Sequence, residues 1–413
     1  MLTFTRAAPA LALCLAACAT ATPADVSSPR AIHERALTLD THLDTPALMG
    51  QPGWDLTQRH DPRQDFSQVD LPRMIEGGLD GGFWVIYTPQ GPLGAEPYAA
   101  ARDAALRRAV TIRDAAARYN QHFELAYTAD DAERIAAAGK RIMFISIENG
   151  YPIGEDLSLM TTFYLLGARM FGPVHFANNQ FGDSATDPNG PRWNGLSPLG
   201  RQAVAEANRL GMVLDASHAS DAVFDEMLTL SRTPIILSHT GAKAIYDHPR
   251  NLDDDRLRRL AAAGGVIQVN SLGAYLTPLP PSPERQAALR AMRGSLSNAP
   301  AESLSAAQAL QMLQARRQLE AQFPAPQATF DDFMRHLLHI LEVVGPEHVG
   351  IGADFDGGGG VVGMQDVADF PKITERLLAA GYSEADIRNI WGGNTLRVLR
   401  AAEAYARNPT PAP

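Results

Sequence analysis

The chain has 413 residues, of which 45% are hydrophobic and 20% charged, a balance typical of a globular protein with a sizeable core. Its net charge of −10 and the lack of any long basic run argue against a nucleic-acid partner. This length allows either two ordinary domains or one large barrel.

The N-terminus carries the pattern of an export signal. Arg6 is followed by an apolar run that ends in Leu15-Ala16-Ala17-Cys18, which resembles the lipobox of bacterial lipoproteins. We therefore expect residues 1–17 to be a lipoprotein signal peptide, Cys18 to be lipidated, and residues 18–33 to form a flexible tether. An ordinary cleaved secretion signal is the alternative.

This signal places the protein in the bacterial cell envelope. Ala19 after Cys18 favours a lipid anchor on the periplasmic side of the outer membrane, whereas ordinary secretion would leave the protein free in the periplasm. The only two cysteines, Cys14 and Cys18, lie in or at the end of the signal. The exported domain therefore has no disulfide, and any metal must be held by His, Asp and Glu.

Short apolar runs alternate with helical patterns along the rest of the chain. Most of these runs are apolar on both faces, which is typical of parallel strands buried on both sides. Eight such units predict an α/β fold, a (β/α)8 TIM-like barrel, with a two-domain doubly wound sheet as the alternative. No Gly-x-Gly-x-x-Gly follows the first strand, which argues against the alternative. The expected strands are 36–44, 82–87, 141–148, 168–175, 212–218, 234–239, 265–270 and 348–354.

Helices are expected between these strands and at the end of the chain. The segment 277–328, in which the letters PLPPSPE begin at residue 278, is too long for a plain loop and predicts a helical insertion between strands seven and eight. We expect the barrel domain to cover residues 34–405 and to be followed by a disordered tail at 406–413. The expected helices include 99–119, 221–230, 252–263 and 385–407, and one that runs from the Ser197-Pro198 pair to Gly211.

Polar residues recur at the ends of the expected strands. The carboxyl ends of the strands in such a barrel meet at one face, where catalytic groups gather. Any one of these residues has an ordinary structural explanation, such as a hydrogen-bonded His or a turn-capping Asp. Their recurrence on different strands instead predicts one shared site. The strand-end residues are His42, Asp44, Glu148, His175, His218, His239, Asp354 and Asp356.

Five of these side chains predict a binuclear metal centre. Three imidazoles and two carboxylates are too many for one tetrahedral site and suit two open sites with a shared ligand. Glutamate has two oxygens and can bridge, so we expect two Zn²⁺ per chain, joined by Glu148 and by a water or hydroxide. His42 and Asp44 would complete one site, and His218 and His239 the other. Without thiolates, manganese, cobalt or iron also remain open.

Several motifs together resemble one known family, the membrane (renal-type) dipeptidases or M19 metallopeptidases. The resemblance extends from about Leu37 to Val398, in family order. It implies a (β/α)8 barrel with a binuclear zinc centre that hydrolyses dipeptides and often accepts a D-residue at the C-terminal position. The family's metal ligands fall on the same five residues. The matching motifs are THLDTP, FWVIYTP, SIENG, GLSPLGRQAVAEANRLGMVLDASH, SHTGAKAIYDHPRN, HVGIGADFDG and WGGNTLRVL.

The resemblance also implies roles for four further residues. Arg250 would bind the substrate carboxylate through its planar guanidinium, and Tyr275 would line the substrate site. His175 would bind substrate and stabilise the developing negative charge, while Asp354 would carry a proton. One departure concerns the segment VNSLGAY, which ends at Tyr275 and lacks the bulky aromatic residues expected around the substrate.

Two other classes of protein remain open at this point. An amidohydrolase-type deaminase or lactonase would use the same barrel, but such enzymes usually open with His-x-His and often bridge their metals with a modified lysine. Here the opening is His42-x-Asp44, and Lys140, Lys243 and Lys372 are not at matching strand ends. A non-catalytic envelope lipoprotein is the second rival. We expect dipeptide substrates and membrane contact only through the lipid; whether the chain forms a homodimer is left open.

Overall fold

The computed structural model describes residues 26–295 and 305–409. The expected signal peptide, the lipidation site Cys18 and the first part of the tether lie outside the described residues, as do the last four residues of the expected tail.

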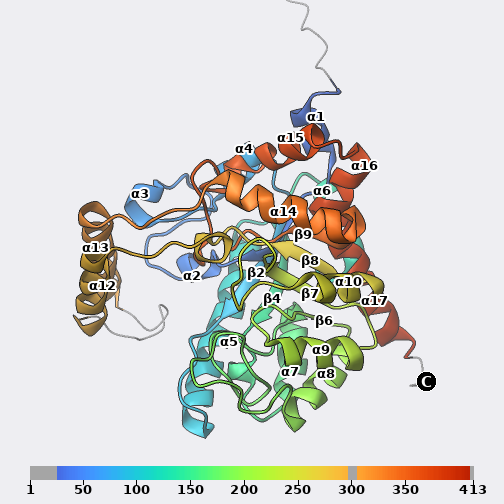
Figure 1. Cartoon of the computed structure of the whole chain (residues 1–413), viewed down its shortest axis with the longest axis horizontal. Helices are drawn as coiled ribbons and strands as arrows, with labels where there is room; N and C mark the ends of the chain where they lie inside the picture. The colour runs from blue at the N-terminus through green and yellow to red at the C-terminus, as the bar shows by residue number, and fades with distance from the viewer. Residues whose placement is uncertain (1–25, 296–304, 410–413) are drawn as a thin grey trace, which may run out of the picture.

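Eight parallel strands form the centre of the protein, and both faces of these strands are buried (Figure 1). Five strands follow one another in the order β1-β2-β4-β5-β6, and a second sheet has the order β7-β8-β9. All strand pairs are parallel. The strands are β1 (Leu39–Leu43), β2 (Gly81–Tyr87), β4 (Arg141–Glu148), β5 (Ala168–Phe171), β6 (Val213–Leu214), β7 (Ile236–Thr240), β8 (Val266–Val269) and β9 (Val349–Ile351).

Single bridges join the two sheets into a closed ring. Between β6 and β7, Ala216 N donates to Ile236 O at 2.8 Å. Between β1 and the segment after β9, Asp44 N donates to Phe355 O at 3.0 Å. The last strand thus returns to the first, which confirms the predicted (β/α)8 barrel and excludes the open, doubly wound alternative.

The strands differ from the prediction in two respects. A short additional strand, β3 (Phe123–Leu125), was not expected. It pairs with the first three residues of β4, Arg141 to Met143. Several strands are also shorter than expected; the run 212–218 contains only the two-residue strand β6. Beyond β6 the pairing continues only as isolated bonds, from Asp215 N to Phe171 O and from Ala216 N to Ile236 O.

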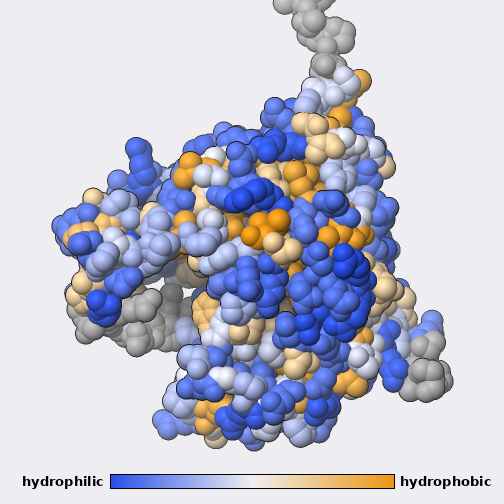
Figure 2. All heavy atoms as spheres, viewed as in Figure 1, coloured by the Kyte–Doolittle hydropathy of each residue, from blue (hydrophilic) through white to orange (hydrophobic). Residues whose placement is uncertain are grey.

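Helices surround the barrel, and none of those described is both long and apolar enough to cross a bilayer. Hydrophilic side chains dominate the face seen in Figure 2, with only small hydrophobic groups between them. The helices are α1 (Pro29–Arg35), α2 (Pro46–Met49), α3 (Pro62–Asp65), α4 (Leu71–Gly77), α5 (Ala95–Arg118), α6 (Ala129–Ala137), α7 (Ser158–Leu166), α8 (Pro198–Leu210), α9 (Asp221–Leu230), α10 (Asp254–Ala262), α11 (Gly273–Leu276), α12 (Pro283–Ser295), α13 (Ala306–Gln322), α14 (Phe330–Val344), α15 (Pro371–Ala379), α16 (Glu384–Arg388) and α17 (Asn394–Arg407).

The predicted insertion between the seventh and eighth barrel strands is confirmed. Helices α12 and α13 lie between β8 and β9 in the chain and project from one side of the barrel (Figure 1). Arg285 of α12 forms a two-pronged ion pair with Glu320 of α13, with N–O distances of 2.6 and 3.0 Å. Arg317 Nε donates to Gln64 O at 2.5 Å, which ties the insertion to α3.

The expected helix 385–407 is interrupted. Between α16 and α17, residues Asn389–Gly393 form one wider π-helical turn. A Cβ on Gly392 would lie 2.5 Å from Leu37 O, so only glycine permits this turn to approach the chain before β1 so closely. Helix α17 then continues to Arg407, so a disordered tail from residue 406 was predicted too early.

The predicted tether is also too long, because residues 29–33 belong to helix α1. Ser28 caps this helix, and His33 anchors it in the protein interior. His33 Nε2 donates to Gly77 O at 2.8 Å, and Thr374 Oγ1 donates to His33 Nδ1 at 2.7 Å. The many small and polar residues between 18 and 33 predicted a flexible segment, so the helix that His33 fixes was not expected.

Acid should loosen this anchor. Burial is the main reason that the pKa of His33 is lowered from 6.5 to about 4. Between these values the unfolded chain binds a proton that the folded chain excludes, so the free energy of unfolding falls as pH falls, by up to about 3 kcal/mol. We expect His33→Gln to flatten the decline of Tm between pH 6.5 and 4. The exposed His122→Gln variant is the control, and an unchanged slope in His33→Gln would contradict the prediction.

Candidate metal centre

The five expected ligands converge on Glu148, the last residue of β4. Glu148 Oε2 lies 3.6 Å from His42 Nε2, and Glu148 Oε1 lies 3.0 Å from His218 Nε2 and 3.5 Å from His239 Nε2. Asp44 lies on the His42 side, with 3.4 Å between Asp44 Oδ2 and His42 Nε2. Oε2 of Glu148 thus lies nearest His42, and Oε1 lies nearest His218 and His239, while the rings of His42 and His239 are themselves only 3.7 Å apart between centroids.

The backbone turns sharply where two site residues leave their strands. His218 has φ +65° and Asp354 has φ +62°, both in the left-handed region that non-glycine residues seldom adopt. Each such residue costs about 1–3 kcal/mol and persists only where the surrounding structure enforces it. These two conformations turn an imidazole and a carboxylate toward Glu148, and sequence patterns do not reveal them.

Burial determines the charge of most histidines in the cluster. It lowers the pKa of His175, His218 and His239 well below the ordinary value, and the nearby Arg250 cation acts in the same direction. These three imidazoles are therefore neutral at pH 7, the state in which a ring nitrogen can bind a cation. His218 Nε2 and His239 Nε2 lie 2.9 Å apart, so both point at the same small space.

His42 differs from the other three. Burial opposes its protonation, but the Glu148 and Asp44 carboxylates outweigh this effect and raise the pKa of His42 well above its ordinary value. The two carboxylates therefore favour the protonated form of His42. A cation held here would compete with that proton.

The glycine-rich loop after β9 brings another carboxylate to the cluster. His42, Asp44 and Asp354 each place a ligand atom within 4.8 Å of the others. A Cβ on Gly357 would lie 2.0 Å from Asp44 Oδ2 and 2.4 Å from Asp354 Oδ1, so glycine is needed for the loop to pass. Burial raises the pKa of Asp354 well above its ordinary value, and the Asp44 and Glu148 carboxylates add to this rise. Asp356 is separate, because it binds Thr45 and Gln68.

His175, expected beside the reacting bond, also lies at the cluster. Its Nε2 atom is 3.6 Å from Glu148 Oε1, and its ring centroid is 4.1 Å from that of His218. Two aromatic rings lie against this imidazole: Tyr87 at 4.7 Å and Phe176 at 3.8 Å between centroids. Neither ring was singled out by the sequence analysis as part of the site.

Arg250 lies deep beside His239. It is only 3% exposed, and its Nη2 donates to His239 O at 3.0 Å. Its Nε–H has no hydrogen-bond partner, and no carboxylate lies within ion-pair distance, among the described residues. Tyr275 lies against it, with the guanidinium carbon 5.2 Å from the ring centroid. A buried cation without an anionic partner is costly, which favours an anionic ligand at this position.

A serine and an aspartate behind the cluster set the orientation of its histidines. Ser238 Oγ donates to Asp215 Oδ2 at 2.5 Å, and Asp215 Oδ1 accepts Ser238 N at 2.9 Å. Because its hydroxyl proton is engaged, Ser238 Oγ can only accept from His239 Nδ1, at 2.9 Å. This fixes the proton of His239 on Nδ1 and leaves Nε2 free to bind a cation. His42 Nδ1 lies 3.5 Å from the same oxygen.

Removal of this hydroxyl should weaken metal binding. We expect Ser238→Ala to lower metal affinity by about 10–100-fold, because His239 then loses the partner that orients it. Activity should recover at high metal concentration. Ser146→Ala is the matched control, since Ser146 Oγ is a buried hydroxyl of β4 without a hydrogen-bond partner among the described residues. Titration with a chelator measures the affinities, and equal values for both variants would contradict the prediction.

The residues present fit a pair of cations. Neutral imidazoles and carboxylates converge on one small space, Gly357 leaves room for it, and the protein fixes the tautomer of His239 from behind. A lysine bridge of the amidohydrolase type has no support. Lys140 pairs with Glu124, Lys243 with Asp247 and Lys372 with Asp369, all away from the cluster.

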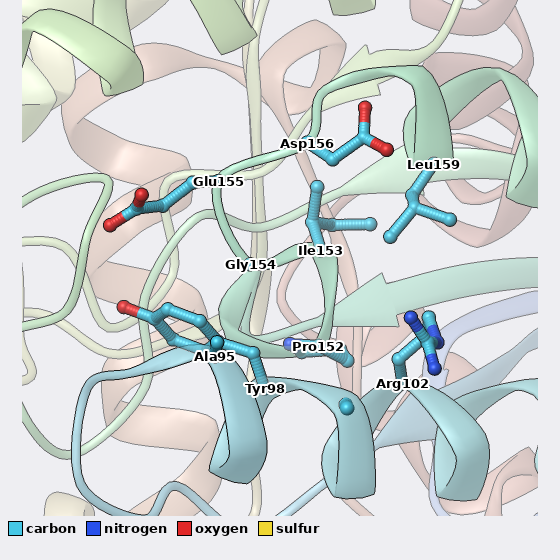
Figure 3. Close-up of a pocket in the computed structure, with 10 residues that line it drawn as sticks. Ala95, Tyr98, Arg102, Pro152, Ile153, Gly154, Glu155, Asp156 and Leu159 are labelled. Atoms are coloured by element: carbon cyan, nitrogen blue, oxygen red, sulfur yellow. The ribbon is translucent and has the colours of Figure 1, made fainter.

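A separate surface cavity of about 460 Å³ lies between α5 and the segment after β4 (Figure 3). Tyr98, Arg102, Glu155 and Asp156 line it, and none of them belongs to the histidine cluster. Arg102 pairs with Asp103, and Asp156 accepts the backbone N–H of Ser158. Two of the charged side chains that line this cavity, Arg102 and Asp156, therefore already make ordinary structural contacts.

A (β/α)8 barrel whose strand ends gather histidines around a central carboxylate defines a metal-dependent hydrolase. The chain belongs to the membrane dipeptidase family, peptidase family M19, whose family model matches residues 26–412. This confirms the resemblance and makes the protein a metallo-dipeptidase by class.

Relatives and solved structures agree with this assignment. The chain is 30% identical over 360 residues to "Dipeptidase tcpJ" of Claviceps purpurea, covering 86% of this chain and 74% of that protein. The probable dipeptidase PvdM from Pseudomonas aeruginosa superimposes with a TM-score of 0.76 at 30% identity, covering 91% of this chain and 98% of that one. A metallo peptidase from Rhodobacter sphaeroides, liganded with a phosphinate mimic of the dipeptide L-Ala-D-Ala, gives 0.70 at 26% identity, covering 89% and 99%.

Proposed function

We propose that the protein is a zinc-dependent dipeptidase that binds the free carboxylate of its substrate through Arg250. The observation that carries this proposal is the buried Arg250 guanidinium beside the ligand cluster, whose Nε–H has no hydrogen-bond partner among the described residues. A dipeptide has a carboxylate one residue from its scissile bond, so a cation at this distance selects short substrates with a free C-terminus. We extend the proposal to a D-residue at the C-terminal position, because the Rhodobacter sphaeroides neighbour binds a mimic of L-Ala-D-Ala.

Two cations would share Glu148 in this proposal. His42, Asp44 and Glu148 would hold one, and Glu148, His218 and His239 the other. Zinc held in this way lowers the pKa of bound water toward about 7 and so supplies hydroxide at neutral pH.

The other polar residues would bind substrate and move protons. His175 lies beside Glu148 and would donate a hydrogen bond to the carbonyl oxygen as negative charge develops there. The departing amine needs a proton, and Asp354 is a buried carboxyl group at the same cluster whose raised pKa suits it to carry one. Arg250 would hold the carboxylate end, so that the scissile bond stays above Glu148.

Hydrolysis of L-Ala-L-Ala, L-Ala-D-Ala and the amide of L-Ala-L-Ala tests this proposal. We expect both free dipeptides to be cleaved, the amide to be cleaved at least about 100-fold more slowly, and a chelator to stop all cleavage until zinc is restored. Equal cleavage of the amide would contradict the role of Arg250. Hydrolysis that resists the chelator, or none with zinc restored, would contradict the dipeptidase itself.

We also propose that Cys18 is lipidated and anchors the enzyme on the periplasmic side of the outer membrane. The order Leu15-Ala16-Ala17-Cys18 at the end of an apolar run supports this location. A Cys18→Ser variant should appear in the soluble fraction of the cell, while the wild type should be found with the membranes. Equal distribution of the two proteins would contradict the anchor.

A further inference from the structure

A large aromatic side chain is exposed directly beside the metal centre. Phe176, in the loop after β5, is 50% exposed, although its ring contacts His175 and lies 5.3 Å from His218 between centroids. Single exposed hydrophobic residues are common on proteins. Among the large exposed hydrophobic residues that the structure describes, however, Phe176 is the one whose ring contacts imidazoles of the site.

The loop that carries Phe176 is held in place. Ser184 Oγ donates to His175 O at 2.5 Å, and Thr186 Oγ1 donates to Phe176 O at 3.3 Å. Asp187 accepts the backbone N–H of Asn178 at 2.8 Å. The aromatic surface is therefore fixed before substrate arrives, so a substrate group that covers it gains contact without ordering the loop.

The position of Phe176 relative to Arg250 indicates which end of a dipeptide it meets. Arg250 follows β7 and contacts His239. Phe176 follows β5 and contacts His175. His218, which follows β6, contacts both of these histidines and so lies between the two sides. If Arg250 holds the C-terminal carboxylate, the N-terminal residue extends toward β5. This step depends on the proposed function.

We propose that Phe176 forms the subsite for the side chain of the N-terminal residue and that it favours dipeptides with an apolar side chain at that position. Such a side chain would cover the exposed part of the ring and remove both apolar surfaces from water. Phe176 would also supply, from the loop after β5, the aromatic surface that the segment ending at Tyr275 lacks.

Three dipeptides and three variants test this subsite. We expect Phe176→Ser to lower kcat/KM for Leu-Gly by about tenfold or more and to change it less than about twofold for Gly-Gly and Gly-Leu. Phe176→Leu, which keeps an apolar side chain, should retain most of the preference. Leu165→Ser, at a 73% exposed position of α7, is the matched control and should leave all three values unchanged.

Other patterns would overturn the inference. A uniform loss on all three substrates would make Phe176 a support for His175 rather than a subsite. A selective loss for Gly-Leu would place the side chain of the C-terminal residue there, and no change in Phe176→Ser would remove any role in binding. If the wild-type protein cleaves no dipeptide, the proposed function fails together with the subsite. If the wild type cleaves dipeptides and only the pattern in Phe176→Ser is wrong, the subsite alone fails.

Discussion

Replacement of Glu148 by Gln is expected to lower kcat/KM by at least about 10³-fold. The two carboxylate oxygens face His42 on one side and His218 and His239 on the other. An amide of the same shape presents a nitrogen to one side and a neutral oxygen to the other, so it cannot bridge two cations. A 10³-fold fall in kcat/KM corresponds to the loss of about 4 kcal/mol of charge stabilisation in the transition state.

The control for this variant is Glu155→Gln, an exposed glutamate in the segment after β4. Folding is checked separately by thermal unfolding without added metal, because the amide relieves the burial that raises the pKa of Glu148 but also removes one of the two carboxylates beside His42. Activity within tenfold of the wild type at saturating zinc would contradict the bridging role.

Replacement of Asp354 by Asn is expected to lower kcat by about 10²–10⁴-fold with little change in KM. Asparagine keeps the size of the side chain but cannot carry a proton to the departing amine. Asp356→Asn is the matched control, because it lies in the same loop but accepts hydrogen bonds from Thr45 Oγ1 and Gln68 N, both at 2.6 Å. That variant should lose stability rather than turnover.

Metal content distinguishes two roles for Asp354. Its carboxylate lies within ligand distance of His42 and Asp44, so it could bind a cation instead of carrying a proton. We expect Asp354→Asn to keep the wild-type metal content while kcat falls. A loss of metal together with activity would make Asp354 a ligand, and a rise in KM at unchanged kcat would make it a binding residue only.

The sequence allowed the barrel and the gathering of these strand-end side chains to be predicted together, because one physical rule governs both. Parallel strands with hydrophobic residues on both faces form a closed barrel, and their carboxyl ends meet at one mouth. Residues as distant in sequence as His42 and Asp354 could therefore be assigned to one site from their strand-end positions alone. The structure brings them together as expected.

Features that depend on tertiary contacts were not predictable in this way. Asp215 and Ser238 stand close to ligands in the sequence, but only the fold reveals that one serine hydroxyl lies near both His239 and His42. The exposure of Phe176 depends on how its loop packs. His33 anchors α1 through Thr374, a residue 341 positions away, so no local pattern could indicate that the tether ends before it.

Elemental analysis of the purified, active enzyme is the most direct test of the binuclear centre. We expect about two equivalents of zinc per chain in the wild type at saturation and at most one in the Glu148→Gln variant. One equivalent or fewer in the active wild type, or two retained in the variant, would contradict a centre joined by Glu148.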